Sequence, residues 1–157
     1  MRNKEKKFSR ENNVENFFKI VKTSYNLLLE KNGKLSIIEK TKEEKGEEKM
    51  KVEYKQKDKL LLLEITEEID HHAVEIIRRK ADYEITRYMP RKVVFDFRHV
   101  TFMDSAGIGM VLGRYKMMKM LGGTVEMTNV SPMLKKIFEM SGITRICPIS
   151  STLEDVS

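Results

Sequence analysis

The pattern of apolar and polar positions changes near residue 50, beyond which short apolar runs alternate with stretches of helical spacing. Apolar runs at 51–54 and 60–65 flank Lys57 and Asp58, and this arrangement predicts an antiparallel hairpin. Each later segment follows either the strand period or the helix period. These segments predict helices at 71–89, 105–121 and 132–141, and strands at 93–97, 124–128 and 143–149.

This order of elements is typical of an α/β domain, in which helices alternate with the strands of a sheet. The first two strands form a hairpin and the later ones follow helices, so we expect a single domain with a mixed sheet of about five strands and helices packed on it. In such folds, binding sites usually lie at the carboxyl ends of the strands. The turn from the strand at 93–97 into the helix at 105–121 is therefore a candidate site.

Residues 1–49 differ in character from the rest of the chain. They are rich in lysine and end in the charged run 39–49, which indicates a poorly structured extension. The apolar positions within 14–30 keep helical spacing, so an amphipathic helix is the alternative. We place the domain boundary at Met50 and assign residues 50–157 to the folded domain.

The charged run before Met50 also permits a different interpretation of the extension. Lysine and glutamate have purine-only codons and glycine can have one, so residues 43–49 can encode a purine-rich ribosome-binding site. On this interpretation the protein begins at Met50 and the preceding segment is a translated leader. The competing interpretation is a genuine amphipathic extension.

Composition narrows the class of protein. A chain of 157 residues with 40% hydrophobic residues can bury one ordinary core. No apolar run reaches the roughly 20 residues of a membrane span, and the charged start does not resemble a secretory signal, so we expect a cytoplasmic protein without a membrane partner. The single cysteine, Cys147, allows no internal disulfide, and the spacing of cysteine and histidine predicts no metal site. We expect no cofactor.

The net charge of +6 suggests nucleic acid, but its distribution weakens that interpretation. Residues 1–49 hold 13 basic and 9 acidic residues, which leaves 17 basic and 15 acidic residues for 50–157. The basic residues of the domain are interleaved with acidic ones and show no aromatic pattern that stacks bases. We therefore expect no direct binding of nucleic acid.

The most distinctive feature is the turn Asp104-Ser105-Ala106-Gly107-Ile108-Gly109. Ser105 occupies the position expected for an N-cap, where its hydroxyl accepts a hydrogen bond from an amide of the first helical turn. Taken alone, this pattern indicates a helix cap, and the two glycines are only a weak phosphate-binding signal.

Several spaced motifs together resemble the STAS-domain anti-sigma factor antagonists of sporulating bacteria, over essentially all of residues 50–157. The centre of the resemblance is the stretch 102–109, which reads Phe-Met-Asp-Ser-Ala-Gly-Ile-Gly. The resemblance extends to the segments 69–72, 112–116, 122–123, 131–132 and 140–142. It implies a STAS-type fold and a role in the regulation of transcription.

In this family the serine after the aspartate is phosphorylated by the anti-sigma factor, which is itself an ATP-dependent serine kinase. The resemblance assigns that role to Ser105. Unphosphorylated antagonist binds the anti-sigma factor and releases the sigma factor, and a phosphate of about −1.5 to −2 charge would end this binding. A serine phosphatase would reverse the change. Relatives often have a second serine next, where this chain has Ala106, so no competing acceptor follows Ser105.

Seven residues are candidates for partner binding. They are Asp70, Asp104, Ser105, Gly107, Ile108, Met110 and Arg114. Asp70 can instead be a simple N-cap of the next helix, and both roles remain open. Met110 and Arg114 belong to a second helical stripe with Met117 and Leu121, which fits either the core or an adaptable methionine-rich contact surface. Within this stripe we expect only Met110 and Arg114 to contact the partner. The helical spacing places Ile108, Val111, Leu112 and Tyr115 together on one face of this helix.

Other functions compete with this switch. An enzyme is not indicated, because no Gly-x-Ser-x-Gly elbow surrounds Ser105 and no histidine lies in an obvious base position. His71, His72 and His99 lack the additional carboxylates and histidines of a metal phosphoesterase. A nucleotide-binding STAS module and a scaffold subunit of a stress-signalling complex both remain open, although the lysine of a phosphate loop is absent.

Overall fold

The computed structural model describes residues 27–29, 35–37 and 49–151. The chain divides into two compact units, Met1–Glu47 and Glu48–Ser157. In the first unit, β1 (Leu27–Leu29) pairs with β2 (Leu35–Ile37) in antiparallel orientation.

This pairing corrects the end of the helix predicted at 14–30, whose remaining residues lie outside the described part of the chain. Three consecutive leucines fit a strand as well as a helix.

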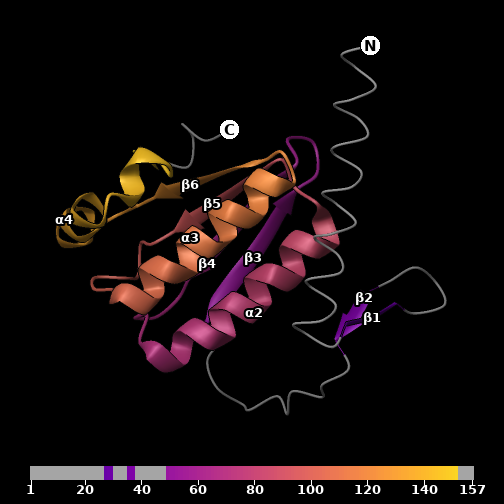
Figure 1. Ribbon diagram of the computed structural model, residues 1–157, viewed down its shortest axis with the longest axis horizontal. Coiled ribbons are helices and arrows are strands. Elements are labelled where there is room, and N and C mark those ends of the chain that lie inside the picture. Colours follow the sequence, from indigo (N-terminus) through magenta and orange to yellow (C-terminus); the bar gives the residue numbers. More distant parts are fainter. Residues whose placement is uncertain (1–26, 30–34, 38–48, 152–157) are drawn as a thin grey trace. The chain divides into compact units, whose positions relative to one another are not determined.

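The second unit is built on one mixed sheet, as the order of apolar segments predicts. Its strand order is β3-β4-β5-β6-β7. β3 runs antiparallel to β4, whereas the neighbouring pairs from β4 to β7 are parallel (Figure 1). The strands are β3 (Met50–Lys55), β4 (Leu60–Ile65), β5 (Lys92–Asp96), β6 (Thr124–Thr128) and β7 (Ile149–Ser150).

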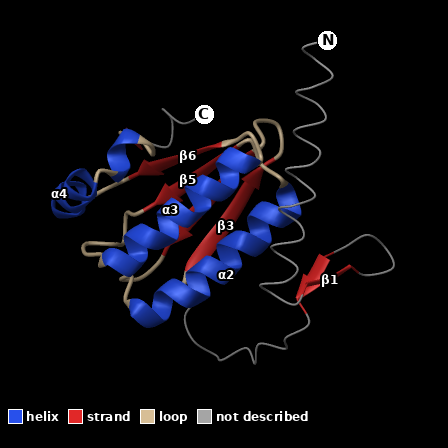
Figure 2. Cartoon of the chain, viewed as in Figure 1, coloured by secondary structure: helices blue, strands red, loops and turns tan. Residues whose placement is uncertain are grey.

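Helices follow the carboxyl ends of β4, β5 and β6. They are α2 (His71–Tyr88), α3 (Ser105–Met120) and α4 (Pro132–Ser141). Figure 2 shows α2 and α3 side by side over one face of the sheet, with α4 beyond one end of β6. No helix in the described ranges is long and apolar enough to span a membrane.

Both faces of the central strands are buried, which explains their nearly continuous apolar sequence. Leu61, Leu63 and Ile65 alternate along β4 and are fully buried. The alternate positions of β4 face the other side of the sheet. There Leu60 and Leu62 form a second apolar cluster with Val94 of β5. The main core therefore lies between the sheet and its helices.

The predicted strand at 143–149 is wrong over most of its length. The chain forms a 3₁₀ turn at Ile143–Arg145, and only Ile149–Ser150 is a strand. Ile143 and Cys147 are buried while Ile146 is 39% exposed. This spacing of four between buried residues follows a helical turn, not the alternation of a strand.

Candidate functional site

Two loops meet at the carboxyl ends of β4 and β5. Ile69, before α2, forms a parallel bridge with Met103, before α3. The next residues are Asp70 and Asp104, and each is the N-cap of its helix. The topology thus places the starts of two helices next to each other, at the edge of the sheet where sites of α/β folds usually lie.

Asp104, not Ser105, is the N-cap of α3, which corrects the role expected for the serine. Asp104 has extended backbone, and its Oδ1 accepts hydrogen bonds from the amides of Ala106 at 2.9 Å and Gly107 at 3.1 Å. A carboxylate caps as well as a hydroxyl, and its charge also interacts favourably with the helix dipole.

Ser105 is therefore the first residue of α3, and its side chain is exposed. No hydrogen bond of its hydroxyl is found within the described part of the chain. The hydroxyl is accessible to an enzyme that approaches from solvent, and the fold does not need it as a cap.

Gly107 is buried and packs beside Met103 and Ile69, the two residues that bridge the loops. A Cβ at this position would overlap Cγ of Met103 and lie 3.2 Å from Cγ2 of Ile69. The absence of a side chain thus lets α3 approach the bridge between the two loops. Gly107 is consequently a packing residue, and the direct partner contact expected for it is not available on the surface.

Met110 and Arg114 are also buried, at 3% and 8% exposure, so the expected partner contact through their side chains is wrong. The guanidinium of Arg114 forms an ion pair with Asp82 of α2, with 2.8 Å between Nε and Oδ1. It also donates a hydrogen bond to the carbonyl of Met110 at 3.1 Å. This stripe joins α3 to α2. Of the four residues predicted to share one face of α3, Val111 is buried, whereas Ile108, Leu112 and Tyr115 are half-buried.

Asp70 is exposed, and its Oδ1 accepts a hydrogen bond from the amide of Ala73 at 2.7 Å. This hydrogen bond is the main reason why the pKa of Asp70 lies below its ordinary value, with smaller contributions from the His72 amide and the charges of Lys49 and His72. The carboxylate is thus ionised at neutral pH, and it is a cap whose outer side remains open to solvent.

Glu68 was not predicted as a site residue, yet it connects the two loops. Its carboxylate accepts hydrogen bonds from the hydroxyl of Thr101 at 2.6 Å and from the amides of Thr101 and Phe102 at 3.1 Å. Desolvation alone would raise the pKa of Glu68, but these hydrogen bonds outweigh it and lower the pKa. No local pattern could reveal the contact, because it joins residues more than 30 positions apart.

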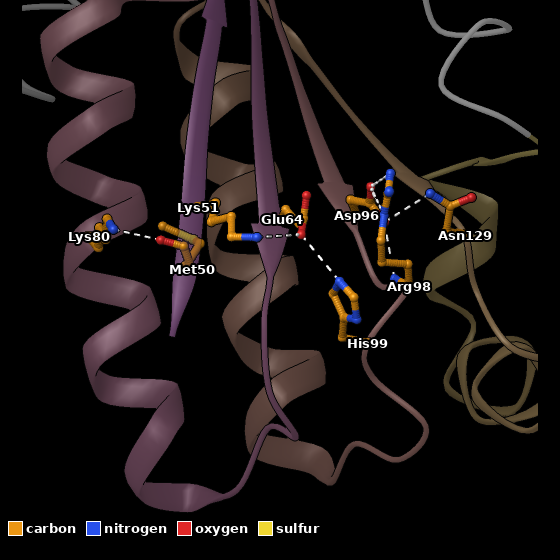
Figure 3. Close-up of polar contacts among 8 residues, drawn as sticks. All are labelled: Met50, Lys51, Glu64, Lys80, Asp96, Arg98, His99 and Asn129. Atoms are coloured by element: carbon orange, nitrogen blue, oxygen red, sulfur yellow. Dashed lines mark hydrogen bonds and ion pairs between the residues drawn. The ribbon is translucent and has the colours of Figure 1, made fainter. Parts of the chain in front are cut away.

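Further polar contacts lie at the carboxyl ends of β4, β5 and β6 (Figure 3). The buried carboxylate of Asp96 accepts hydrogen bonds from Nη2 of Arg98 at 2.6 Å and from Nδ2 of Asn129 at 2.9 Å. Nε2 of His99 lies 3.2 Å from Oε1 of Glu64, a residue of β4. A shallow pocket lined by Arg98, Asn129, Val130 and Ser131 follows the ends of β5 and β6. Within the described ranges, no group of three or more His, Cys, Asp or Glu side chains could hold a metal ion.

Comparisons with known proteins agree with this arrangement. The sequence matches the STAS domain over residues 51–156. An anti-sigma F factor antagonist of Paenibacillus polymyxa is 34% identical over 90 residues, which cover 57% of this chain and 77% of the relative. An anti-sigma-B factor antagonist of Bacillus subtilis (strain 168) is 29% identical over 103 residues, which cover 66% and 93%.

Solved structures give the same result. The unphosphorylated form of the anti-sigma factor antagonist SpoIIAA superposes with a TM-score of 0.59 at 30% identity, covering 68% of this chain and 92% of that chain. The phosphorylated form of SpoIIAA from Bacillus superposes with a TM-score of 0.54 at 30% identity, covering 68% and 96%. The family match spans more than half of the sequence and the fold agrees with it, so this chain belongs to the STAS domain family.

Proposed function

We propose that this protein is an anti-sigma factor antagonist that is switched off by phosphorylation of Ser105. In the unphosphorylated form it binds an anti-sigma factor with serine kinase activity, and the sigma factor is released. The observation that carries the proposal is the exposed hydroxyl of Ser105 at the first position of α3, directly after Asp104, in a chain whose relatives are named anti-sigma factor antagonists.

The docking surface of this proposal comprises the exposed parts of the two adjoining helix starts. Asp70 and Ser105 are exposed, and Asp104 and Ile108 are half-buried. Gly107, Met110 and Arg114 lie beneath this surface and act only through packing. The protein itself supplies a binding surface and an acceptor hydroxyl, and the kinase supplies the catalysis.

Electrostatics explain how one phosphate can switch this surface without unfolding the domain. The phosphate adds about −1.5 to −2 charge beside Asp104, whose carboxylate already accepts hydrogen bonds from the Ala106 and Gly107 amides. The helix dipole partly compensates an anion at this end of α3, so the fold tolerates the modification. The surface nevertheless becomes strongly negative and no longer fits the partner.

Incubation of the purified protein with an anti-sigma factor kinase and ATP tests this function. We expect mass spectrometry to find one phosphate on Ser105, gel filtration to show loss of the complex, and a serine phosphatase to restore it. Ser105→Ala should bind the kinase and take up no phosphate. Phosphate on another residue, or a complex that survives full phosphorylation, would contradict the proposal. Binding of nucleotide by the protein alone would instead support a nucleotide-binding module.

The same proposal predicts where the protein acts. Sigma factors and their regulators work in the cytoplasm, so we expect the protein in the cytoplasmic fraction. The anti-sigma factor and the serine phosphatase are its expected partners, and no direct contact with nucleic acid is required.

A further inference from the structure

Phe102 is an exposed aromatic residue on the loop that leads to Ser105. Its side chain is 56% exposed, whereas the following Met103 is 1% exposed. Burial of an exposed phenylalanine by a partner lowers the free energy of the complex. Aromatic residues are also common among the residues that dominate binding at interfaces. Phe102 lies three positions before Ser105, on the loop that enters α3, and both residues are exposed.

The backbone beneath Phe102 is held by contacts that a surface loop does not usually have. Glu68 accepts hydrogen bonds from the Thr101 hydroxyl and from the amides of Thr101 and Phe102. The bridge between Ile69 and Met103 follows directly. The segments 66–70 and 97–104, which we call the two-loop platform, are thus joined by a carboxylate and by backbone pairing.

We propose that Phe102 is the apolar anchor with which this protein docks into a hydrophobic pocket of its anti-sigma factor, and that Glu68 is the positioning residue that holds this anchor in place. The inference rests on the proposed function, because it assigns the partner from that function. Hydrogen bonds to Glu68 hold the backbone of this loop before the partner arrives, so binding costs less conformational entropy than ordering a mobile loop would.

The contribution of Phe102 to affinity can be measured by isothermal titration calorimetry of the full chain with recombinant anti-sigma F factor. The anti-sigma F factor is the target named for two relatives. Phe102→Ala should weaken binding roughly 10- to 30-fold, and Phe102→Leu should weaken it less. The matched control is Met133→Ala on α4, an apolar residue that is 62% exposed and lies outside the platform. Its affinity should stay within about twofold of the unmodified chain.

Two measurements separate a positioning role of Glu68 from a general loss of stability. In Glu68→Ala, the amides of Thr101 and Phe102 should exchange with solvent at least about tenfold faster, while core amides keep their protection. Glu68→Gln retains one acceptor oxygen and should recover part of the affinity. In the Phe102→Ala background, Glu68→Ala should weaken binding no further, because a positioning residue acts through the anchor.

The results distinguish this inference from the function on which it rests. If the unmodified chain does not bind the anti-sigma factor, the proposed function fails. If it binds and Phe102→Ala binds equally well, the anchor is refuted while the function stands. If Glu68→Ala and Phe102→Ala weaken binding additively, Glu68 does not position the anchor.

Discussion

Asp104 and Ser105 have different roles at the start of α3, because the aspartate caps the helix and the serine stays exposed. Asp104→Ala should therefore lower the free energy of unfolding by about 1 kcal/mol. Ser105→Ala should change it by no more than about 0.5 kcal/mol, as at an ordinary surface position. Urea unfolding followed by circular dichroism measures both variants. An equal loss in the two would mean that the serine shares the cap.

The sequence locates the site residues but does not show which of them are exposed. Asp70, Asp104 and Ser105 follow predicted strands, so their position at the edge of the sheet could be inferred. The burial of Arg114 could not be inferred, because arginine side chains are mostly exposed. Arg114 is buried because it forms an ion pair with Asp82 of the neighbouring helix α2. Such pairs depend on which helices become neighbours, and a local pattern does not contain that information.

At the scale of elements, the Asp82–Arg114 pair holds α2 against α3. Arg114→Ala should lower the free energy of unfolding by about 3–5 kcal/mol, because it removes the guanidinium whose charge offsets the buried carboxylate of Asp82. The double variant Asp82→Leu, Arg114→Met should recover most of this loss, since apolar residues of similar volume avoid the desolvation cost. A double-mutant cycle with the single variants Asp82→Leu and Arg114→Met, measured by urea unfolding, gives the coupling energy. Additive losses would show that the ion pair does not join the helices.

Glycines of α3 offer a test of how closely the helix approaches the two-loop platform. Gly107→Ala should destabilise the domain by about 1–3 kcal/mol, because a Cβ there overlaps Met103. Gly109→Ala is the matched control, since its Cβ would have no neighbour within 4 Å. It should stabilise the helix by about 0.5–1 kcal/mol. Thermal unfolding midpoints that shift in the same direction for both variants would contradict this packing.

The sequence predicts the ends of a helix well where the capping residues are distinctive. Ser131, Pro132 and Gly142 mark α4 correctly, since the side chain of Ser131 accepts a hydrogen bond from Leu134 and Gly142 has a φ of 75°. The strand predicted at 143–149 is wrong over most of its length because the segment is short and apolar, and such runs fit a turn or a strand equally. The prediction for α3 fails at Met110, which is buried, because a methionine stripe suits a core and a contact surface equally well.

At the scale of the whole molecule, buried carboxylates make stability depend on pH. Desolvation alone would raise the pKa of Asp96, but hydrogen bonds from Arg98 and Asn129 and the charge of Arg98 lower it. An acid whose pKa is lower in the folded state stabilises the fold fully above its ordinary value of 3.8 and loses this effect as the pH falls further. We expect the free energy of unfolding to decline below about pH 4, and less steeply in Asp96→Asn. An identical acid slope in that variant would exclude Asp96 as a cause.

Cys147 reports on opening of the whole domain, because it is the chain's single cysteine and is fully buried. Burial raises the pKa of its thiol to about 11, so the reactive thiolate is scarce at pH 8. Alkylation should therefore require opening, and its rate should rise about tenfold for each 1.4 kcal/mol of lost stability. Gly107→Ala, at the start of α3, should accelerate labelling. The increase in rate should match the loss in free energy of unfolding that is measured for this variant. A labelling rate unchanged in this variant would show that the thiol is exposed by local motion near the 3₁₀ turn.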